Sequence, residues 1–198
     1  MSPPRVSSFI GHGLAALTLS ALAPQASPRR QAWTAWLVLL ALAPDADYGL
    51  PVLLLPGTPP LRTTHSLVGC LALPLLTVAG LRLLGVRGRA LAVRAAQAAG
   101  AGLSHVVLDL LVGVTPAALL WPLWDGRFRL PFGVLPSAGR PRLDNPLFYR
   151  NLLIELGVLV PLFTGLVLAR AKRARGLTLA GLLAVALGFM AWAASLPR

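Results

Sequence analysis

The stretch "AGLSHVVLDLL" (residues 101–111) decides how this chain is interpreted, because it places His105 and Asp109 inside an otherwise apolar run. The whole chain has only three histidines and six acidic residues. Residues four apart lie on one face of an α-helix, with about 5–6 Å between their Cβ atoms. A charged side chain at the centre of a bilayer costs roughly 2.5–3.5 kcal/mol on insertion scales. The two side chains can therefore reach one point together, and their place in an apolar helix needs a reason.

The composition is that of an integral membrane protein. Of the 198 residues, 56% are hydrophobic and 12% are charged, and the mean hydropathy is +0.73, whereas a soluble domain carries about 25% charged residues. The net charge of +12 comes almost entirely from arginines in short clusters between apolar runs. This pattern fits contact with anionic membrane lipids, and we expect no binding to nucleic acid. The single cysteine, Cys70, excludes an internal disulfide and is expected to be a small core residue.

Six apolar runs predict an all-α fold. They fall at about 6–23, 32–43, 66–84, 95–114, 151–169 and 177–195. Crossing a bilayer takes about 20 residues, so the second run is short for a full crossing. We predict a polytopic membrane helix bundle with four to six transmembrane helices, six being preferred. Residues 1–135 are expected to form the membrane-embedded core, and residues 136–198 a proline-rich connection followed by a C-terminal helical hairpin.

The basic residues predict how the bundle is oriented. Short loops rich in arginine and lysine lie on the cytoplasmic side of bacterial membranes. Three connections between the apolar runs carry such clusters: Arg29 and Arg30; Arg82, Arg87, Arg89 and Arg94; and Arg170, Lys172, Arg173 and Arg175. The longer segment 115–150 is rich in proline, glycine and aromatic residues, and we expect it to form a folded external or interfacial cap.

Three further polar motifs lie in or beside apolar runs. His12 is in "FIGHGLAAL" (9–17), Asp45 and Asp47 are in "LAPDADYG" (42–49), and His65 is in "LRTTHSLVG" (61–69). On the predicted topology these residues reach the same depth, on the same side, as the histidine and aspartate of residues 101–111. Neutral imidazoles and carboxylates are ligands of divalent metals. We therefore predict one metal site formed by six residues: His12, Asp45, Asp47, His65, His105 and Asp109.

Several structural alternatives stay open for these residues taken singly. His12 could be hydrogen-bonded to a neighbouring helix, the two residues of the 101–111 stretch could form a buried ion pair, and "PDAD" could be a plain turn. Pro44 favours an extended or turn conformation after the second run. His65 is expected to open the next helix, with Thr63 or Thr64 as its N-cap. The other acidic residues, Asp125, Asp144 and Glu155, are expected to serve in surface pairing or at helix starts.

The ordered motifs resemble a known family. "GHGLAAL" (11–17), "PDAD" (44–47), "RTTHSL" (62–67) and "HVVLD" (105–109) together resemble the LexA-regulated, membrane-bound metal-dependent hydrolases of the YdjM type, which are bacterial inner-membrane proteins. The resemblance covers roughly residues 9–135. The family often has a His-Arg pair before its Thr-His-Ser motif, whereas this chain has Leu61 and Arg62, so the role of that histidine is not carried over.

A more distant resemblance is to the zinc-dependent phospholipase C and P1 nuclease group, which is all-helical. It implies one metal held by Asp45 or Asp47 with His65, His105 and Asp109. It also implies a second metal that shares Asp109 and adds His12. The group's third-metal ligands are absent here, because no histidine follows His105.

The resulting expectation is a membrane-bound metal-dependent hydrolase acting on a lipid or phosphoester substrate. A divalent metal, zinc by preference and one or two ions in number, would activate a water molecule. Whichever of Asp45 and Asp47 does not bind metal would be the general base, and Arg62 would steady an anionic group. The alternatives are an intramembrane cation or proton transporter, and a non-catalytic membrane scaffold with a structural metal.

Overall fold

All regular secondary structure in the described part of the chain is helical. The computed structural model describes residues 8–23, 29–46, 63–112, 116–130, 133–136 and 144–196. These residues form six α-helices: α1 (Phe9–Leu22), α2 (Arg30–Leu42), α4 (Leu67–Leu83), α5 (Gly88–Val112), α6 (Pro146–Arg170) and α7 (Gly176–Ser195). Two short 3₁₀ turns, η1 (Ala43–Asp45) and η2 (Thr63–His65), lie between α2 and α4. Each helix coincides with one of the six apolar runs, and the prediction of an all-α fold is confirmed.

Three of these helices, α5, α6 and α7, are long and apolar enough to cross a bilayer. α1 and α4 are apolar but shorter. The prediction of a polytopic membrane helix bundle is therefore confirmed. It stays a prediction that the three shorter helices, α1, α2 and α4, also span the membrane.

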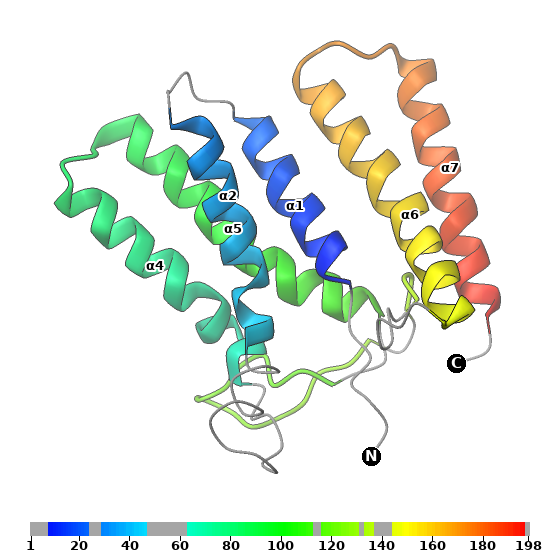
Figure 1. Ribbon diagram of the computed structural model, residues 1–198, viewed down its shortest axis with the longest axis horizontal. Coiled ribbons are helices and arrows are strands. Elements are labelled where there is room, and N and C mark those ends of the chain that lie inside the picture. The colour runs from blue at the N-terminus through cyan, green and yellow to red at the C-terminus, as the bar shows by residue number, and fades with distance from the viewer. Residues whose placement is uncertain are drawn as a thin grey trace.

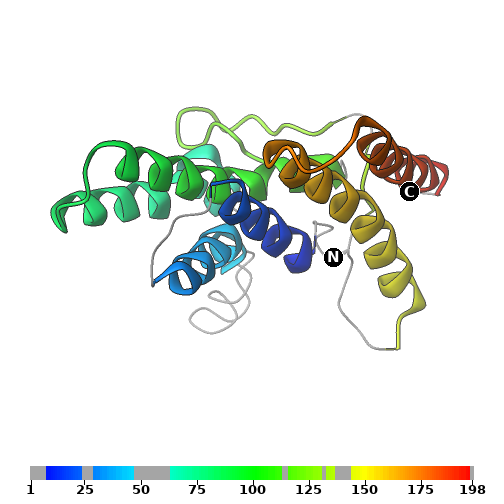
Figure 2. The same cartoon turned by 90° about the horizontal axis from the view of Figure 1, so that it is seen from above.

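α1 is at the centre of the arrangement. It packs against α2, α5 and α6, while α4 packs against α5, and α6 against α7. In Figures 1 and 2, α2 and α4 lie on one side of α1 and the α6–α7 hairpin on the other, while α5 runs from α4 past α1 toward α6. The start of α2, the α4–α5 connection and the α6–α7 connection lie at the upper end of Figure 1. The three basic clusters therefore lie at one end of the helices.

Two apolar clusters hold the helices together. One lies between α1, α2 and α5, and its buried residues are Ala16, Leu37, Leu40, Ala41, Ala98 and Ala101. The other joins α1, α5 and α6, and its buried residues are Ala15, Leu108, Val112, Leu135, Val158 and Leu159. Small side chains such as alanine let helix backbones approach closely, as is usual in membrane bundles. Glycine serves the same purpose between α4 and α5, because a Cβ on Gly102 would lie 2.2 Å from the carbonyl oxygen of Cys70.

The structure corrects one detail of the local prediction and decides another that was left open. Ser66 is the N-cap of α4, since its hydroxyl accepts a hydrogen bond from the Gly69 N–H at 3.0 Å. Thr63 and His65 belong to η2, one turn earlier, so the prediction that a threonine caps this helix was wrong. η1 begins at Ala43 directly after α2 and includes Pro44, so of the two conformations expected after the second run, Asp45 lies in the turn.

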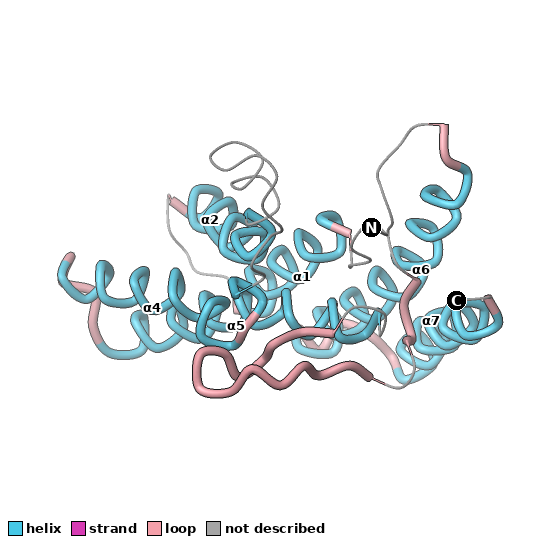
Figure 3. The backbone as a smooth tube through the Cα atoms, turned by 90° about the horizontal axis from the view of Figure 1, so that it is seen from below, coloured by secondary structure: helices cyan, strands magenta, loops and turns pink. Residues whose placement is uncertain are grey.

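The segment after α5 folds back beside the start of α4. Ala117 and Phe128 form an isolated antiparallel bridge, and the Leu67 N–H donates to the Leu119 carbonyl at 2.9 Å. Figure 3 shows this loop passing along α5 toward the α6–α7 hairpin. Residues 116–130 are thus a folded cap attached to the first residue of α4.

Candidate metal centre

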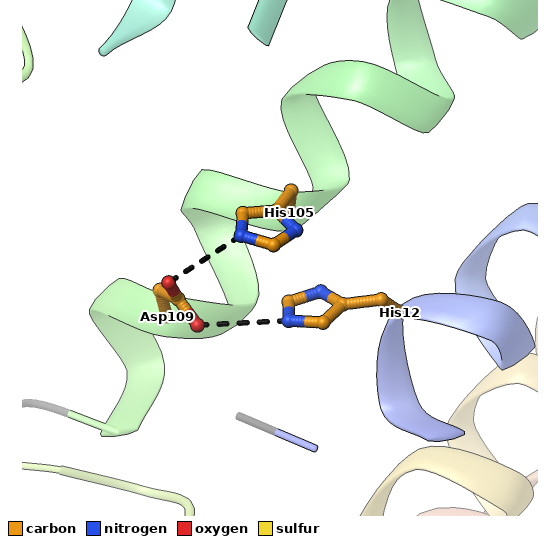
Figure 4. A group of neighbouring side chains, drawn as sticks. All are labelled: His12, His105 and Asp109. Carbon is orange, nitrogen blue, oxygen red and sulfur yellow. Dashed lines mark ion pairs between the residues drawn. The ribbon is translucent and has the colours of Figure 1, made fainter. Parts of the chain in front are cut away.

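Five of the six predicted ligands converge on one point of the described chain. His12 comes from α1, Asp45 from η1, His65 from η2, and His105 and Asp109 from α5. The three histidines are at most 1% exposed and Asp109 is 9% exposed. Figure 4 shows the imidazole of α1 and the two side chains of α5 pointing toward one another. Asp47 and Arg62 lie outside the described residues.

Four ligand atoms are spaced as neighbours around a common ion would be. Asp45 Oδ1 lies 3.5 Å from His65 Nε2 and 3.6 Å from His105 Nε2. Asp109 Oδ2 lies 3.6 Å from each of the same two nitrogens. These separations are longer than N–H···O hydrogen bonds, which span about 2.7–3.2 Å. They are close to the edge of about 3.3 Å expected for a tetrahedron with metal–ligand bonds of about 2.0–2.1 Å.

The second oxygen of Asp109 faces the other way, toward α1. Its Oδ1 lies 3.6 Å from His12 Nε2 (Figure 4). The two oxygens of Asp109 therefore face different histidines. Oδ2 faces His65 and His105, and Oδ1 faces His12. This is the arrangement of a bridging carboxylate, and it accommodates either one or two ions.

Hydrogen bonds on the far side of the rings orient the histidines. His105 Nδ1 lies 2.8 Å from the carbonyl oxygen of Ala41, on α2. A carbonyl only accepts, so Nδ1 carries the proton and Nε2 keeps its lone pair for the centre of the cluster. His65 Nδ1 lies 3.2 Å from Thr64 Oγ1, which again leaves Nε2 facing inward.

The two rings nearest each other are stacked. His12 and His105 have centroids 4.0 Å apart and an interplanar angle of 14°. This stack joins α1 to α5 at the cluster.

Several buried polar atoms of this cluster form no hydrogen bond within the described part of the chain. They are both ring nitrogens of His12, Oδ1 of Asp45 and Nε2 of His105. Buried polar groups without hydrogen bonds are rare and need an explanation. A divalent cation would satisfy imidazole lone pairs and carboxylate oxygens at once, and the mixture of ligand types is one that zinc accepts. The residues present therefore fit a metal.

Asp45 lies beyond the end of α2, in η1. Burial raises the pKa of its carboxyl, but the nearby imidazoles of His65, His105 and His12 together outweigh burial, so the pKa lies below its usual value. Asp45 is thus ionised at neutral pH, as a metal ligand must be.

The Thr-His-Ser motif positions His65 through contacts with the first turn of α4. The Ser66 hydroxyl donates to the Thr63 carbonyl at 2.7 Å. A Cβ on Gly69 would lie 2.6 Å from that same carbonyl oxygen, so only glycine lets η2 lie this close to the helix. The short turn is thereby fixed, and it directs the imidazole inward.

Sequence reasoning missed one buried acidic residue. Glu155 was expected in surface pairing or at a helix start, but it lies inside α6 and is 0% exposed. Its Oε1 accepts a hydrogen bond from the Ser8 N–H at 3.1 Å. The signal that could have revealed it is that it is the only charged side chain between residues 151 and 169. Asp125 and Asp144 are exposed, as expected.

Comparisons with known proteins identify the family. No curated protein and no solved structure matches the chain. The model of the YdjM inner membrane protein family matches residues 8–196, which extends the resemblance from the ligand motifs through the C-terminal hairpin. The more distant resemblance to the zinc phospholipase C group stays a prediction. Because the family match covers nearly the whole chain and three helices can cross a bilayer, this chain belongs to the YdjM inner membrane protein family and is a multi-pass protein of the inner membrane.

Proposed function

We propose that this chain is a membrane-bound metal-dependent hydrolase that acts on a lipid or phosphoester substrate. The observation that carries the proposal is the spacing of Asp45, His65, His105 and Asp109, whose four nitrogen–oxygen separations are 3.5–3.6 Å. The location of the cluster in a multi-pass inner-membrane protein favours a substrate drawn from the membrane or its surface.

The ligand set supports zinc as the metal. Imidazole and carboxylate ligands in tetrahedral spacing suit this ion. When bound, it would supply Lewis acidity and lower the pKa of a water molecule to about 7. One ion would be held by Asp45, His65, His105 and Oδ2 of Asp109, and a second by Oδ1 of Asp109 with His12.

Unequal burial of the ligands indicates where substrate enters. The side chain of Asp45 is 24% exposed, whereas that of Asp109 is 10% exposed and that of His65 is 2% exposed. The histidines are thus the most buried part of the cluster, and Asp45 in η1 is more exposed than Asp109 and His65. Substrate and the attacking water would reach the cluster from the side of Asp45.

Two further residues, Asp47 and Arg62, have proposed roles that rest on the sequence alone. Oδ1 of Asp45 faces two histidines, which supports Asp45 as a metal ligand, and Asp47 would then be the general base. Arg62 comes three residues before His65, and its guanidinium would hold an anionic oxygen such as that of a phosphoester.

Metal analysis combined with activity measurements tests the proposal. The full-length protein would be purified in lipid nanodiscs and assayed for bound metal and for hydrolysis of phospholipid and of a soluble phosphodiester. Asp109→Asn should lose all metal and hydrolysis, and His105→Ala should lose hydrolysis and the ion on the His65 side of the cluster. Ser104→Ala is the matched control on the same helix, because its hydroxyl donates to the Ala101 carbonyl of that helix, and it should retain both.

The other outcomes separate the alternatives. Wild-type protein without stoichiometric metal would overturn the proposal. Bound metal without hydrolysis, together with unfolding on chelation, would indicate a structural metal. A cation or proton flux in proteoliposomes that Asp109→Asn abolishes would indicate transport instead.

A further inference from the structure

Glu155 is an unusual residue for its place in the fold. It lies in the middle of α6, a helix long and apolar enough to cross a membrane, and it is completely buried. Ionisable side chains in such helices are expensive and generally face the interior of the bundle, where other groups compensate them. Here the carboxylate lies against the first turn of α1, and the two helices run side by side in Figure 1.

A short chain of hydrogen bonds connects Glu155 to His12. The Ser8 N–H donates to Glu155 Oε1 at 3.1 Å, and the carbonyl of Ser8 accepts from the His12 N–H at 3.2 Å. The hydroxyl of the same serine caps α1 by accepting from the Gly11 N–H at 3.1 Å. One residue, Ser8, therefore joins the α6 carboxylate to the backbone of a histidine in the cluster.

The sequence of α1 leaves room for the carboxylate. A Cβ on Gly11 would lie 2.2 Å from Glu155 Oε1, so any other residue at this position would displace the carboxylate. Gly13, two residues later, has nothing within 4 Å of such a Cβ. The N-terminus of a helix also carries roughly half a unit of positive charge, which favours a carboxylate there.

We propose that Glu155 is a positioning residue for His12, and that through it the C-terminal hairpin completes the metal centre. The carboxylate fixes Ser8, Ser8 fixes the first turn of α1, and that turn holds the imidazole opposite Oδ1 of Asp109. The core of the site therefore does not end near residue 135, since it requires a residue of α6. The part of this inference that concerns metal affinity rests on the proposed function.

Zinc titration of the metal-free, full-length protein tests the proposal. Glu155→Leu removes the acceptor, and Gly11→Ala displaces it from the opposite side. Both should weaken zinc binding about tenfold or more, the usual effect of losing a group that orients a ligand. Glu155→Gln keeps an oxygen that can accept from Ser8, so it should bind zinc nearly as the wild type does. Gly13→Ala is the matched control and should also remain close to wild type.

A double-substitution cycle separates positioning from general loosening of the fold. In a His12→Ala background, Glu155→Leu should cause no further loss of zinc affinity, because the residue through which it acts is gone. The proposal is overturned if the loss is the same with and without His12, or if Glu155→Gln loses as much affinity as Glu155→Leu.

Amide hydrogen exchange in the absence of metal provides a readout that does not depend on the proposed function. Glu155→Leu should speed exchange in residues 8–12, the N-cap and first turn of α1, but not in residues 105–109 of α5. Ile154→Val, which trims the neighbouring buried side chain of α6, should leave residues 8–12 unchanged. Unchanged exchange in Glu155→Leu would overturn the positioning role. Absence of zinc binding in the wild type would instead count against the proposed function, and the exchange data would still decide the role of Glu155.

Discussion

Nδ1 of His105 lies 2.8 Å from the carbonyl oxygen of Ala41, and this contact ties α5 to the last turn of α2. It has two consequences. The contact directs Nε2 of the same ring toward Asp45 and Asp109, and it satisfies a carbonyl of a completely buried residue. His105 is thus both a candidate ligand and a structural link, and substitution can separate the two roles.

His105→Asn should keep the link and lose the ligand. The asparagine amide can donate to the Ala41 carbonyl but has no nitrogen lone pair at the position of Nε2. We expect it to bind no metal at the His65 side of the cluster, while metal-free protein unfolds at a higher temperature than metal-free His105→Ala. Leaving a buried carbonyl unsatisfied costs about 1–3 kcal/mol. Equal unfolding temperatures for the two metal-free variants would contradict the structural role.

Substitution of Asp109 should remove metal from both parts of the cluster, the part near His65 and His105 and the part near His12. Its two oxygens face His12 and the His65–His105 pair, each at 3.6 Å. We expect Asp109→Asn to abolish all metal binding. His12→Ala should retain the ion held with Asp45 and lose at most the other. Elemental analysis of the purified variants measures this directly, and an Asp109→Asn protein with a full complement of metal would contradict it.

Removal of the metal should lower the stability of the wild type. An ion that binds only the folded state contributes about 2.7 kcal/mol when its free concentration is 100 times the dissociation constant. Chelation should therefore lower the unfolding temperature of the wild type and of Ser104→Ala by similar amounts. His105→Asn, which already lacks the ion on the His65 side of the cluster, should show a much smaller drop in unfolding temperature. Thermal unfolding with and without chelator checks this, and an equal response of all three proteins would point to an effect of the chelator itself.

The sequence was sufficient to predict that the ligands converge, because that depended on short-range geometry and on shared depth. The four-residue spacing of His105 and Asp109 on one helix was readable directly. The predicted topology placed His12, Asp45 and His65 at a similar depth on the same side as that pair, so a bundle of the six helices had to bring them to one level. The physical cost of burying polar groups in an apolar run made these residues conspicuous.

Contacts between distant parts of the chain were beyond such reasoning. Glu155 is 147 positions from Ser8, and no local pattern reveals that an N–H of the first turn needs a carboxylate. The cap of α4 was misplaced for a similar reason. Thr63, Thr64 and Ser66 are all good N-caps by residue type, and only the packing of η2 on the helix selects the serine.

The cap formed by residues 116–130 should lie in the lipid headgroup layer. Leu123 is 87% exposed and Trp124 is 55% exposed, and tryptophan is enriched at membrane interfaces. A nitroxide label on Leu123→Cys, in a Cys70→Ala background, should collide more with oxygen dissolved in lipid than with a water-soluble nickel complex. A label on Arg173→Cys, in the α6–α7 connection, provides the aqueous comparison. Equal accessibility of both labels to the nickel complex would place the cap in water.

The close approach of α4 and α5 should be intolerant of a single methyl group. A Cβ on Gly102 would lie 2.2 Å from the carbonyl oxygen of Cys70, which is backbone and cannot move without shifting α4. His65 lies two residues before the start of α4, and His105 lies three residues after Gly102, so separation of these helices also widens the candidate metal centre. Gly102→Ala should therefore lower both the unfolding temperature and the zinc affinity. Gly80→Ala is the matched control, because its new methyl group has nothing within 4 Å and alanine favours the helix by about 0.5–1 kcal/mol. Gly80→Ala should leave zinc affinity unchanged and stability equal or higher. A Gly102→Ala protein that behaves like this control would show that the two helices can separate without disturbing the site.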